Sequence, residues 1–537
     1  RGDRSISRKT PGKLRRAIEG FGMSGPEPTM SDHIAELRAR QARAREMGGE
    51  EGLKRHRESG RLPVRERIEM LIDPDSWFEI GALALPEMRS ERHVPGDAAV
   101  TGFGLLDGRR VGVIGIDSSV LAGTTAPVGM RKQGRLIEHA QQKGFPIVLL
   151  CDADGGRIPD VMGWRFSTLP LDFQTFLKRT DGGPDVPRAA AVLGPSYGDS
   201  ALHASTADFV VMAEFASLAL VGPSVIEPAT GEKLTDHELG GPDRATAVGN
   251  AHMVVETEAE AFDAIAAFLS FLPSNSARPA PVAPPADPLT DPAELESIVP
   301  LGAKSGYDMR SVIAAIADGG SIMAWADNWG PSLLTCFARL EGDPVGIVAN
   351  QPIIRAGALD ADALRKELAF VRLCDRFNLP LVFLHDVPGL MVGTEAEKAG
   401  TLKAYEELAL GISTAKVPKL GCVLRKAYGG GHFAMGGRPT HPDFLFAWPS
   451  AELGFMAPDT GIRTVHRRQL EATLAKDGRA AHDALLEQLQ SEWTAISEPW
   501  EAAANLAFDD IIEPGRTREV LIQALAVAWG EGERVRP

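Results

Sequence analysis

The sequence predicts a layered α/β fold that occurs twice in the chain. Short apolar runs at residues 111–116 and 146–150 alternate with helical patterns such as residues 130–142, which is the β–α alternation of a layered sheet protein. Residues 274–292 are rich in Pro and Ala and have no apolar periodicity, so they predict an extended linker between two halves. The chain beyond this linker then repeats the pattern of the chain before it.

The repeat is visible as a constant offset between matching residues. Gly112 and Gly346 are 234 positions apart, and the same spacing relates Ala122 to Ala356, Gly123 to Gly357, Lys132 to Lys366, Pro146 to Pro380, Asp152 to Asp386 and Gly155 to Gly389. Farther along, Asp208 matches Asp443 and Pro223 matches Pro458 at an offset of 235. Two copies are too few for a solenoid, so we expect paired domains that face each other or a partner subunit.

The repeat and the linker suggest five segments. Residues 1–29 form a basic head that we expect to be disordered, residues 30–90 an N-terminal helical segment, residues 91–273 the first domain, residues 274–297 the linker, and residues 298–537 the second domain with C-terminal helices. In the N-terminal segment we expect a helix over residues 31–47 with Ser31 as its N-cap, followed by an amphipathic helix that presents Ile68, Leu71 and Ile72. Helical periodicity returns at residues 470–492 and 516–529.

Composition excludes several classes of protein. The chain has 537 residues, 44% of them apolar, and a net charge of -15, which argues against extensive nucleic-acid binding. Its four cysteines form no C-x-x-C pair, so the sequence offers no zinc ribbon and no disulfide framework and favours a cytoplasmic protein. The longest apolar run, residues 209–226, contains Glu214 and Pro223 and is therefore expected to be buried in the fold rather than in a membrane.

Glycine-rich loops follow apolar strands in both copies. They are Asp152-Ala-Asp-Gly-Gly-Arg157 and Gly194-Pro-Ser-Tyr-Gly198 in the first copy, and Asp386-Val-Pro-Gly389 and Gly429-Gly-Gly431 in the second. Such a loop before a helix directs backbone N–H groups and the positive helix end at one point, which suits an anion or a developing oxyanion. The alternative is that they are only tight turns between strand and helix.

Side-chain chemistry is sparse by comparison. The sequence has no G-x-S-x-G motif, no H-E-x-x-H motif and no close cluster of His and Cys, so we predict no metal site. His432, beside the three glycines, is the one histidine singled out as a candidate contact. Arg157 is expected to orient its loop or to contact a phosphate, and Lys132 and Lys366 are expected to lie on solvated helix faces.

Several segments in a fixed order carry a resemblance to a known family. They are Gly60 to Glu79, Thr230 to Gly241, Val348 to Pro352, Phe370 to Asp375, Asp386 to Gly393 and Arg425 to Gly431. Together they resemble the carboxyltransferase β subunits of biotin-dependent acyl-CoA carboxylases, the family of propionyl-CoA and methylcrotonyl-CoA carboxylases. The likeness covers about residues 48–523.

The resemblance implies two crotonase-type domains of βαβ superhelical units in a homo-oligomer, usually a hexamer built as a trimer of dimers. Acyl-CoA would bind the first domain and carboxybiotin the second domain of a neighbouring subunit. The biotin would be carried by a partner subunit with biotin carboxylase and biotin carrier domains. No catalytic side chain is then needed, because in this family the biotin supplies the base that removes the α proton.

Mapping by motif gives the expected site residues. Gly155 and Gly156 would stabilise the acyl-CoA enolate, Gly430 and Gly431 the biotin ureido oxygen, and Pro388, Gly389 and Met391 would line the biotin side. Phe433, together with Trp164 from the other side and with His432 and Arg157 near the substrate, would shape a pocket for an acyl group other than propionyl.

The chain also departs from the family pattern. Asp154 and Asp199 stand where the family has small residues, and Pro458, which has no N–H, interrupts a glycine-rich turn. Either carboxylate would repel an enolate if it faced the site. These departures leave open a non-catalytic member that binds CoA or a partner. A second alternative, the carboxyltransferase of a decarboxylase or transcarboxylase, stays open because the direction of transfer depends on the partner subunits.

Overall fold

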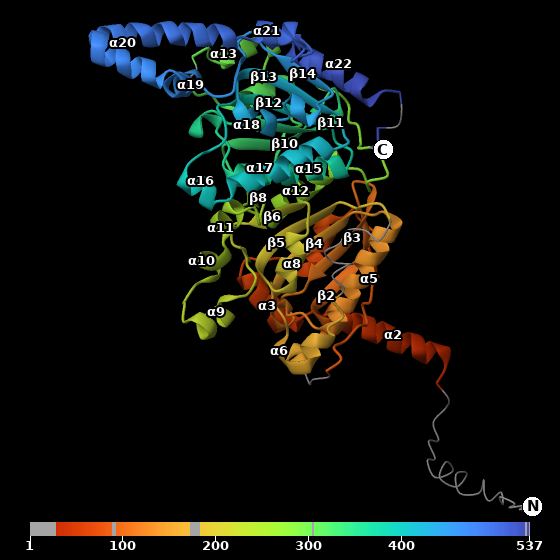
Figure 1. The fold of residues 1–537 in the computed structure, drawn as a ribbon. Coiled ribbons are helices and arrows are strands. Elements are labelled where there is room, and N and C mark those ends of the chain that lie inside the picture. Colours follow the sequence, from red (N-terminus) through yellow and green to blue (C-terminus); the bar gives the residue numbers. More distant parts are fainter. Residues whose placement is uncertain (1–27, 89–92, 172–182, 303–304, 532–533, 536–537) are drawn as a thin grey trace, which may run out of the picture.

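The computed structural model describes residues 28–88, 93–171, 183–302, 305–531 and 534–535 (Figure 1). Two mixed sheets dominate it, the first in the lower half of Figure 1 and the second in the upper half. The predicted α/β class is confirmed. The predicted disordered head, residues 1–29, falls almost wholly outside the described residues.

The first sheet has eight strands in the order β1-β2-β3-β4-β5-β6-β8, with β7 paired to β5. The strands are β1 (Phe78–Ile80), β2 (Ala99–Leu106), β3 (Arg109–Ile116), β4 (Ile147–Asp154), β5 (Arg188–Tyr197), β6 (Phe209–Ala213), β7 (Ser217–Leu218) and β8 (Met253–Val255). The first three are antiparallel neighbours, and from β3 onward every pairing is parallel.

The second sheet has the same number of strands in the order β9-β10-β11-β12-β13-β14-β16, with β15 paired to β13. The strands are β9 (Met323–Ala324), β10 (Leu333–Leu340), β11 (Asp343–Asn350), β12 (Leu381–Val387), β13 (Lys419–Tyr428), β14 (Phe444–Ala447), β15 (Glu452–Gly454) and β16 (Asp510–Ile511). Its antiparallel and parallel pairings follow the pattern of the first sheet, strand for strand.

The equivalence extends to irregular details. The register between β4 and β5 shifts between Cys151 and Ala153, and the register between β12 and β13 shifts between His385 and Val387, 234 residues later. Isolated bridges join Thr125 to Gly156 and, at the same offset, Leu359 to Leu390. A bulge and a bridge at matched positions give both copies the same loop path at the carboxyl ends of their strands.

Matching helices carry a matching buried lysine. Lys132 on α5 (Pro127–Lys143) donates from Nζ to the carbonyls of Gly96 and Ala99, and Lys366 on α15 (Ala361–Arg376) donates to the carbonyls of Ala326 and Leu333. Both side chains are buried, so the prediction of solvated helix faces is wrong. A buried ammonium group persists here because each one has two carbonyl acceptors.

The N-terminal segment has three helices, α2 (Met30–Arg45), α3 (Gly49–Glu58) and α4 (Val64–Leu71), of which α4 packs against β2 and β3 of the first sheet. Ile68, Leu71 and Ile72 are buried, as the amphipathic pattern predicts. The predicted N-cap is wrong: Thr29 caps α2, because its hydroxyl accepts from the N–H of Asp32 and the Asp32 carboxylate accepts from the N–H of Thr29.

An aromatic core joins the two halves. Phe209 on β6 stacks on Phe268 of α12 (Glu258–Phe271) at 4.9 Å, and Phe268 meets Phe337 of β10 at 5.6 Å. Phe337 in turn lies 5.1 Å from Phe370 of α15. The main hydrophobic core is therefore continuous from one sheet to the other.

The remaining helices cover the sheets or extend from them. They are α6 (Ile158–Val161), α8 (Asp199–Ser205), α9 (Pro223–Thr230), α10 (Asp236–Gly240), α11 (Pro242–Ala247), α13 (Leu295–Ile298), α14 (Met309–Ile316), α16 (Thr394–Lys398), α17 (Thr401–Thr414), α18 (Gly429–Ala434), α19 (Pro458–Val465), α20 (Arg467–Ser497), α21 (Pro499–Ala504) and α22 (Thr517–Trp529). The predicted C-terminal helices are present, and α20 is broken at Gly478, where φ is +82°. Residues 274–290 form the extended connection.

Candidate functional site

The first glycine loop follows β4 and is fixed by backbone hydrogen bonds to Thr125. Thr125 donates its N–H to the carbonyl of Gly155 at 2.9 Å, and the N–H of Arg157 donates to the carbonyl of Thr125 at 2.8 Å. Gly155 needs its φ of +76°, which disfavours any residue with a Cβ. Among the described residues, no backbone hydrogen bond is donated by the N–H of Gly155 or Gly156. Two donors are therefore available at the turn.

The second loop follows β12 and is fixed in the same way by Leu359. Leu359 donates its N–H to the carbonyl of Gly389 at 3.2 Å, and Met391 donates its N–H to the carbonyl of Leu359 at 2.8 Å. Gly389 has a φ of +132°. Since the N–H of Met391 is engaged in the anchor, Met391 has no backbone donor left for a ligand.

The three glycines at residues 429–431 begin α18 directly after β13. The N–H groups in the first turn of a helix have no partner within that helix, so Gly430 and Gly431 direct donors outward. A Cβ on Gly431 would lie 2.7 Å from Cγ2 of Val387 and 2.8 Å from Cα of Gly389. A Cβ on Gly430 would meet its nearest neighbour, Leu390, at 3.3 Å. Only a residue without a Cβ therefore fits at position 431, where the first turn of α18 touches the loop after β12.

A buried aspartate precedes each loop and is held by basic side chains. Asp152 accepts from Arg61 at 2.6 Å and from Arg67 at 2.9 Å. Asp386 pairs with Arg425 at 2.9 Å and with Lys426 at 3.3 Å. Each carboxylate is desolvated but neutralised, so it anchors the strand end without leaving an unpaired buried charge.

Arg157 is nearly buried and holds the first loop in place. One terminal nitrogen pairs with Asp97 at 2.5 Å, and the other donates to the carbonyl of Thr124 at 2.8 Å. Asp97 also accepts from the N–H of Gly129 at the start of α5, at 2.7 Å. Arg157 therefore ties the loop to α5, which is the orienting role among its two expected roles.

Asp199 lies behind the first loop rather than in front of it. Its side chain is almost fully buried, and Oδ1 accepts from the hydroxyl of Thr125 at 2.7 Å. Burial raises the pKa of this carboxyl to about 6. Pro458 occupies the first position of α19, where a helix needs no N–H donor. Of the three departures noted in the sequence, Asp154 is the one that lines a cavity.

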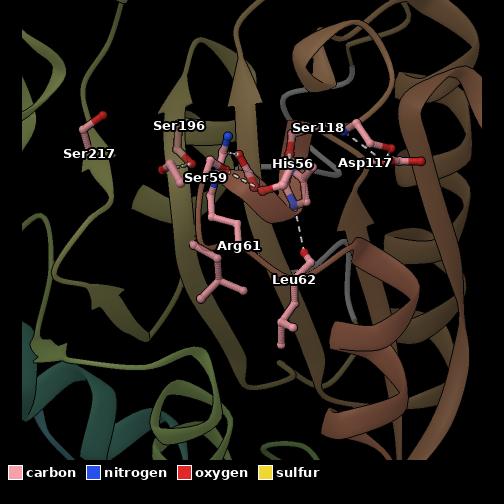
Figure 2. Close-up of polar contacts among 12 residues, drawn as sticks. His56, Ser59, Arg61, Leu62, Asp117, Ser118, Ser196 and Ser217 are labelled. Carbon is pink, nitrogen blue, oxygen red and sulfur yellow. Dashed lines mark hydrogen bonds and ion pairs between the residues drawn. The ribbon is translucent and has the colours of Figure 1, made fainter. Parts of the chain in front are cut away.

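A cavity of about 1150 Å³ opens in front of the first loop. Its lining includes Asp154, Gly155, Gly156, Arg157, Tyr197, Gly198, His56, Ser118 and residues 220–222. Figure 2 shows His56 between Ser118 and Leu62. His56 Nε2 lies 2.9 Å from the carbonyl of Leu62, and Nδ1 lies 3.2 Å from the hydroxyl of Ser118.

The side chains that were predicted to contact the substrate lie in both halves of the chain. Trp164, in a short 3-10 helix (Gly163–Thr168), is 72% exposed, and Phe433 on α18 is 38% exposed. Figure 1 places α6, next to Trp164, and α18 in different halves of the molecule, so one chain does not bring Trp164 and Phe433 together. His432 packs 5.5 Å from the ring of His385, and burial lowers the pKa of His432 to about 4.

Two further features bear on ligands. Within the described ranges, no three His, Cys, Asp or Glu side chains gather as a metal site. None of the helices in the described part of the chain is both long enough and apolar enough to cross a bilayer.

Sequence reasoning missed the groups that hold the loops. The anchors at Thr125 and Leu359 act through backbone atoms, so no residue type marks them, although they obey the 234-residue offset. Asp97 and His56 lie far from the glycine motifs along the chain and have no counterpart that a motif could reveal. The matched aspartates Asp152 and Asp386 were visible in the offset but were not assigned a role.

The fold and these loops define a class of protein: an α/β protein with two equivalent glycine-rich loops, one in each sheet, at the carboxyl ends of the parallel strands. A family model described as the carboxyl transferase domain matches residues 55–536. The chain is 35% identical over 504 residues to the propionyl-CoA carboxylase carboxyltransferase subunit of Haloferax mediterranei, covering 93% of this chain and 96% of that protein. It is 32% identical to the methylmalonyl-CoA decarboxylase subunit alpha of Veillonella parvula, covering 95% and 98%.

A solved structure agrees with these relatives. The transcarboxylase 12S hexamer with methylmalonyl-coenzyme A and methylmalonic acid bound superposes with a TM-score of 0.87 at 34% identity, covering 95% of this chain and 97% of that one. The chain belongs to the carboxyl transferase family, and it is a biotin-dependent acyl-CoA carboxyltransferase.

Proposed function

We propose that this chain is the carboxyltransferase subunit of an acyl-CoA carboxylase and works in the direction of carboxylation. The observation that carries the proposal is a set of unengaged N–H donors in each half: those of Gly155 and Gly156 in the anchored loop after β4, and those of Gly430 and Gly431 in the first turn of α18, which touches the anchored loop after β12. Bound biotin supplies the carboxyl group and the base for the α proton. The residues of the chain bind, orient and stabilise charge.

Gly155 and Gly156 stabilise the enolate oxygen of the acyl-CoA in this proposal, because both residues line the cavity and, among the described residues, neither N–H donates a backbone hydrogen bond. Gly430 and Gly431 hold the ureido oxygen of biotin with the first-turn donors of α18. Pro388, Gly389 and the side chain of Met391 form the wall on the biotin side. The residues present fit biotin, since Gly431 keeps this wall in direct contact with the donor turn.

The two loops lie in different halves of one chain, and we propose that a second copy completes the site. Acyl-CoA on the first half of one subunit would then face biotin on the second half of its neighbour, in a hexamer like that of the 12S structure. The proposed halves are two crotonase-type domains, residues 91–273 and 298–537. The assembly is cytoplasmic, and a partner subunit with biotin carboxylase and carrier domains delivers the biotin.

The proposal is tested by giving the purified chain carboxybiotin and a panel of acyl-CoA thioesters, and by identifying the biotinylated protein that co-purifies with it. Carboxylation together with a biotin carboxylase partner supports the proposal. A membrane decarboxylase partner would support the reverse direction, which the likeness to a methylmalonyl-CoA decarboxylase favours. CoA binding without transfer to any thioester would indicate the non-catalytic alternative.

Acyl preference is part of the proposal. Phe433 and, from a neighbouring subunit, Trp164 shape a pocket for an acyl group other than propionyl; His432 supports Phe433, with ring centroids 5.7 Å apart. Comparing carboxylation rates across the panel for wild type and Phe433→Asp tests this role. We expect the variant to shift toward propionyl-CoA, and an unchanged preference would contradict the assignment.

A further inference from the structure

Tyr405 is an aromatic side chain that lies beside the glycine turn of the second half. It is on α17, next to Ala404 and near Leu408, two of the residues that this helix buries. The helix packs against α18, and both helices lie in the upper half of Figure 1. Tyr405 packs against the main hydrophobic core and is partly exposed. Its ring is therefore held by packing, while part of the side chain reaches the surface.

The hydroxyl of Tyr405 stands close to Gly430. A Cβ on Gly430 would lie 3.5 Å from both Cζ and Oη of Tyr405, and 3.3 Å from Cδ1 of Leu390 on the anchored loop. The Cβ of a helical residue tilts toward the N-terminal end of its helix, which is also the direction in which the first-turn N–H groups point. The hydroxyl of Tyr405 is therefore on the side of Gly430 to which the N–H of Gly430 is directed. Since glycine has no Cβ, residue 430 does not fill the space between Leu390 and Tyr405.

This hydroxyl is available as a hydrogen-bond donor. Among the described residues it has no hydrogen-bond partner. The hydroxyl of Tyr197, by contrast, donates to the carboxylate of Asp236. That of Tyr428 donates to the carboxylate of Glu452. Burial raises the pKa of Tyr405, so its phenol keeps the proton at neutral pH. A partly buried donor without an acceptor in its own chain is suited to an acceptor on a ligand.

We propose that the hydroxyl of Tyr405 donates a hydrogen bond to the ureido oxygen of biotin, as a third donor beside the N–H groups of Gly430 and Gly431. The inference rests on the proposed biotin site and adds a side chain to a set of donors that otherwise belongs to the backbone. A donor aimed at an oxygen that gains negative charge during transfer lowers the barrier more than it strengthens ground-state binding. Tyr405 is thus a catalytic residue, because it touches the cofactor.

A packing role for Tyr405 gives different expectations. Phenylalanine keeps the ring that contacts Gly430 and Leu390, and it removes only the hydroxyl. Because that hydroxyl has no partner among the described residues, Tyr405→Phe takes no hydrogen bond from this part of the fold. An effect of this variant on biotin binding therefore reports a contact with the ligand. Tyr405→Leu removes both the ring and the hydroxyl and measures the contribution of packing.

The test measures three quantities on the full chain: calorimetric affinity for biocytin, the conjugate of biotin with lysine; transfer of labelled carboxyl from carboxybiotin to acyl-CoA; and the melting temperature. For Tyr405→Phe we expect about three- to tenfold weaker binding of biocytin and about 10²-fold lower kcat. Its melting temperature and its affinity for free CoA should match those of the wild type. Ser413→Ala removes an exposed hydroxyl from the same helix and is the control, which should change none of these quantities.

The outcomes separate the inference from the proposed function. If Tyr405→Phe binds biocytin and transfers carboxyl within about twofold of the wild type, the inference is overturned and transfer by backbone donors stands. Loss of both properties in Tyr405→Leu alone would make Tyr405 a packing residue and would also overturn the inference. Tighter binding of biocytin by Tyr405→Phe would show that the hydroxyl obstructs the ligand. If the wild type neither binds biocytin nor carboxylates any thioester, the proposed function fails and the inference fails with it.

Discussion

Replacing Gly431 by Ala should disable the biotin half of the site without unfolding the protein. The added Cβ would lie 2.8 Å from Cα of Gly389 and 2.7 Å from Cγ2 of Val387, whereas carbon atoms in contact are usually about 3.5–4.0 Å apart. One of the two loops must therefore move by roughly 0.7 Å or more. Overpacking of this kind costs about 1–3 kcal/mol of stability.

The loss in activity should exceed the loss in stability. Displacing one oxyanion donor typically reduces turnover by about 10²–10³-fold, or ~3–4 kcal/mol in the barrier. The assay is transfer of labelled carboxyl from carboxybiotin to acyl-CoA, with thermal unfolding measured in parallel. Affinity for free CoA should not change, because the first loop lies in the other half of the chain.

Gly430→Ala is the matched control for the fold. Its Cβ would lie 3.3 Å from Leu390 and 3.5 Å from the hydroxyl of Tyr405, contacts that small side-chain shifts can absorb. We expect its melting temperature to stay near that of the wild type, since Ala also favours the helix by up to about 1 kcal/mol relative to Gly. If Gly431→Ala transfers carboxyl within about threefold of the wild type, close contact between the two loops is not what positions the donors.

Two pH predictions follow from buried ionisable groups, and both are read as the difference in free energy of unfolding between wild type and variant at several pH values. Burial lowers the pKa of Lys366 to about 7, so above pH 7 the unfolded chain binds more protons than the folded chain. Relative to Lys366→Met, the free energy of unfolding of the wild type should therefore rise by about 1.4 kcal/mol per pH unit between pH 7.5 and 9.5. A difference that does not vary with pH would contradict the burial of this ammonium group. Burial raises the pKa of Asp199 to about 6 from its usual value of 3.8, so the folded chain binds more protons than the unfolded chain between these two pH values. Relative to Asp199→Asn, the wild type should lose about 2 kcal/mol of stability as the pH rises from 4 to 6.5, and a gain over that window would refute the sign.

The sequence predicted features that repeat or that have local periodicity. The βα alternation and the constant offset were sufficient to predict two related α/β halves, and the glycine motifs pointed to the loops at the strand ends. The solvent exposure of Lys132 and Lys366 was predicted wrongly because helical position alone does not reveal that two carbonyls from a neighbouring segment accept from each ammonium group. In the same way, the motif position of Asp199 suggested that its carboxylate could repel an enolate. Only its hydrogen bond from the hydroxyl of Thr125 shows that the carboxylate points to the back of the first loop.

Site geometry depends on pairs that are distant along the chain. Arg157 and Asp97 are separated by 60 residues, and His56 and Ser118 by 62, so neither pair appears as a motif. Whether a carboxylate faces a cavity, as Asp154 does, depends on the path of the bulged strand end rather than on the residue type. Spatial neighbours of this kind require coordinates.

The anchors at Thr125 and Leu359 have a consequence for how the two halves of the site could diverge. Each anchor consists of one accepted and one donated backbone hydrogen bond, so it holds the loop whether the anchoring residue is a threonine or a leucine. The loops themselves read Asp-Gly-Gly-Arg at 154–157 and Pro-Gly-Leu-Met at 388–391, yet they leave their strands along the same path. Because the anchors use backbone atoms alone, the residues of one loop can change while the other loop stays as it is. The same duplicated fold can therefore bind two different ligands.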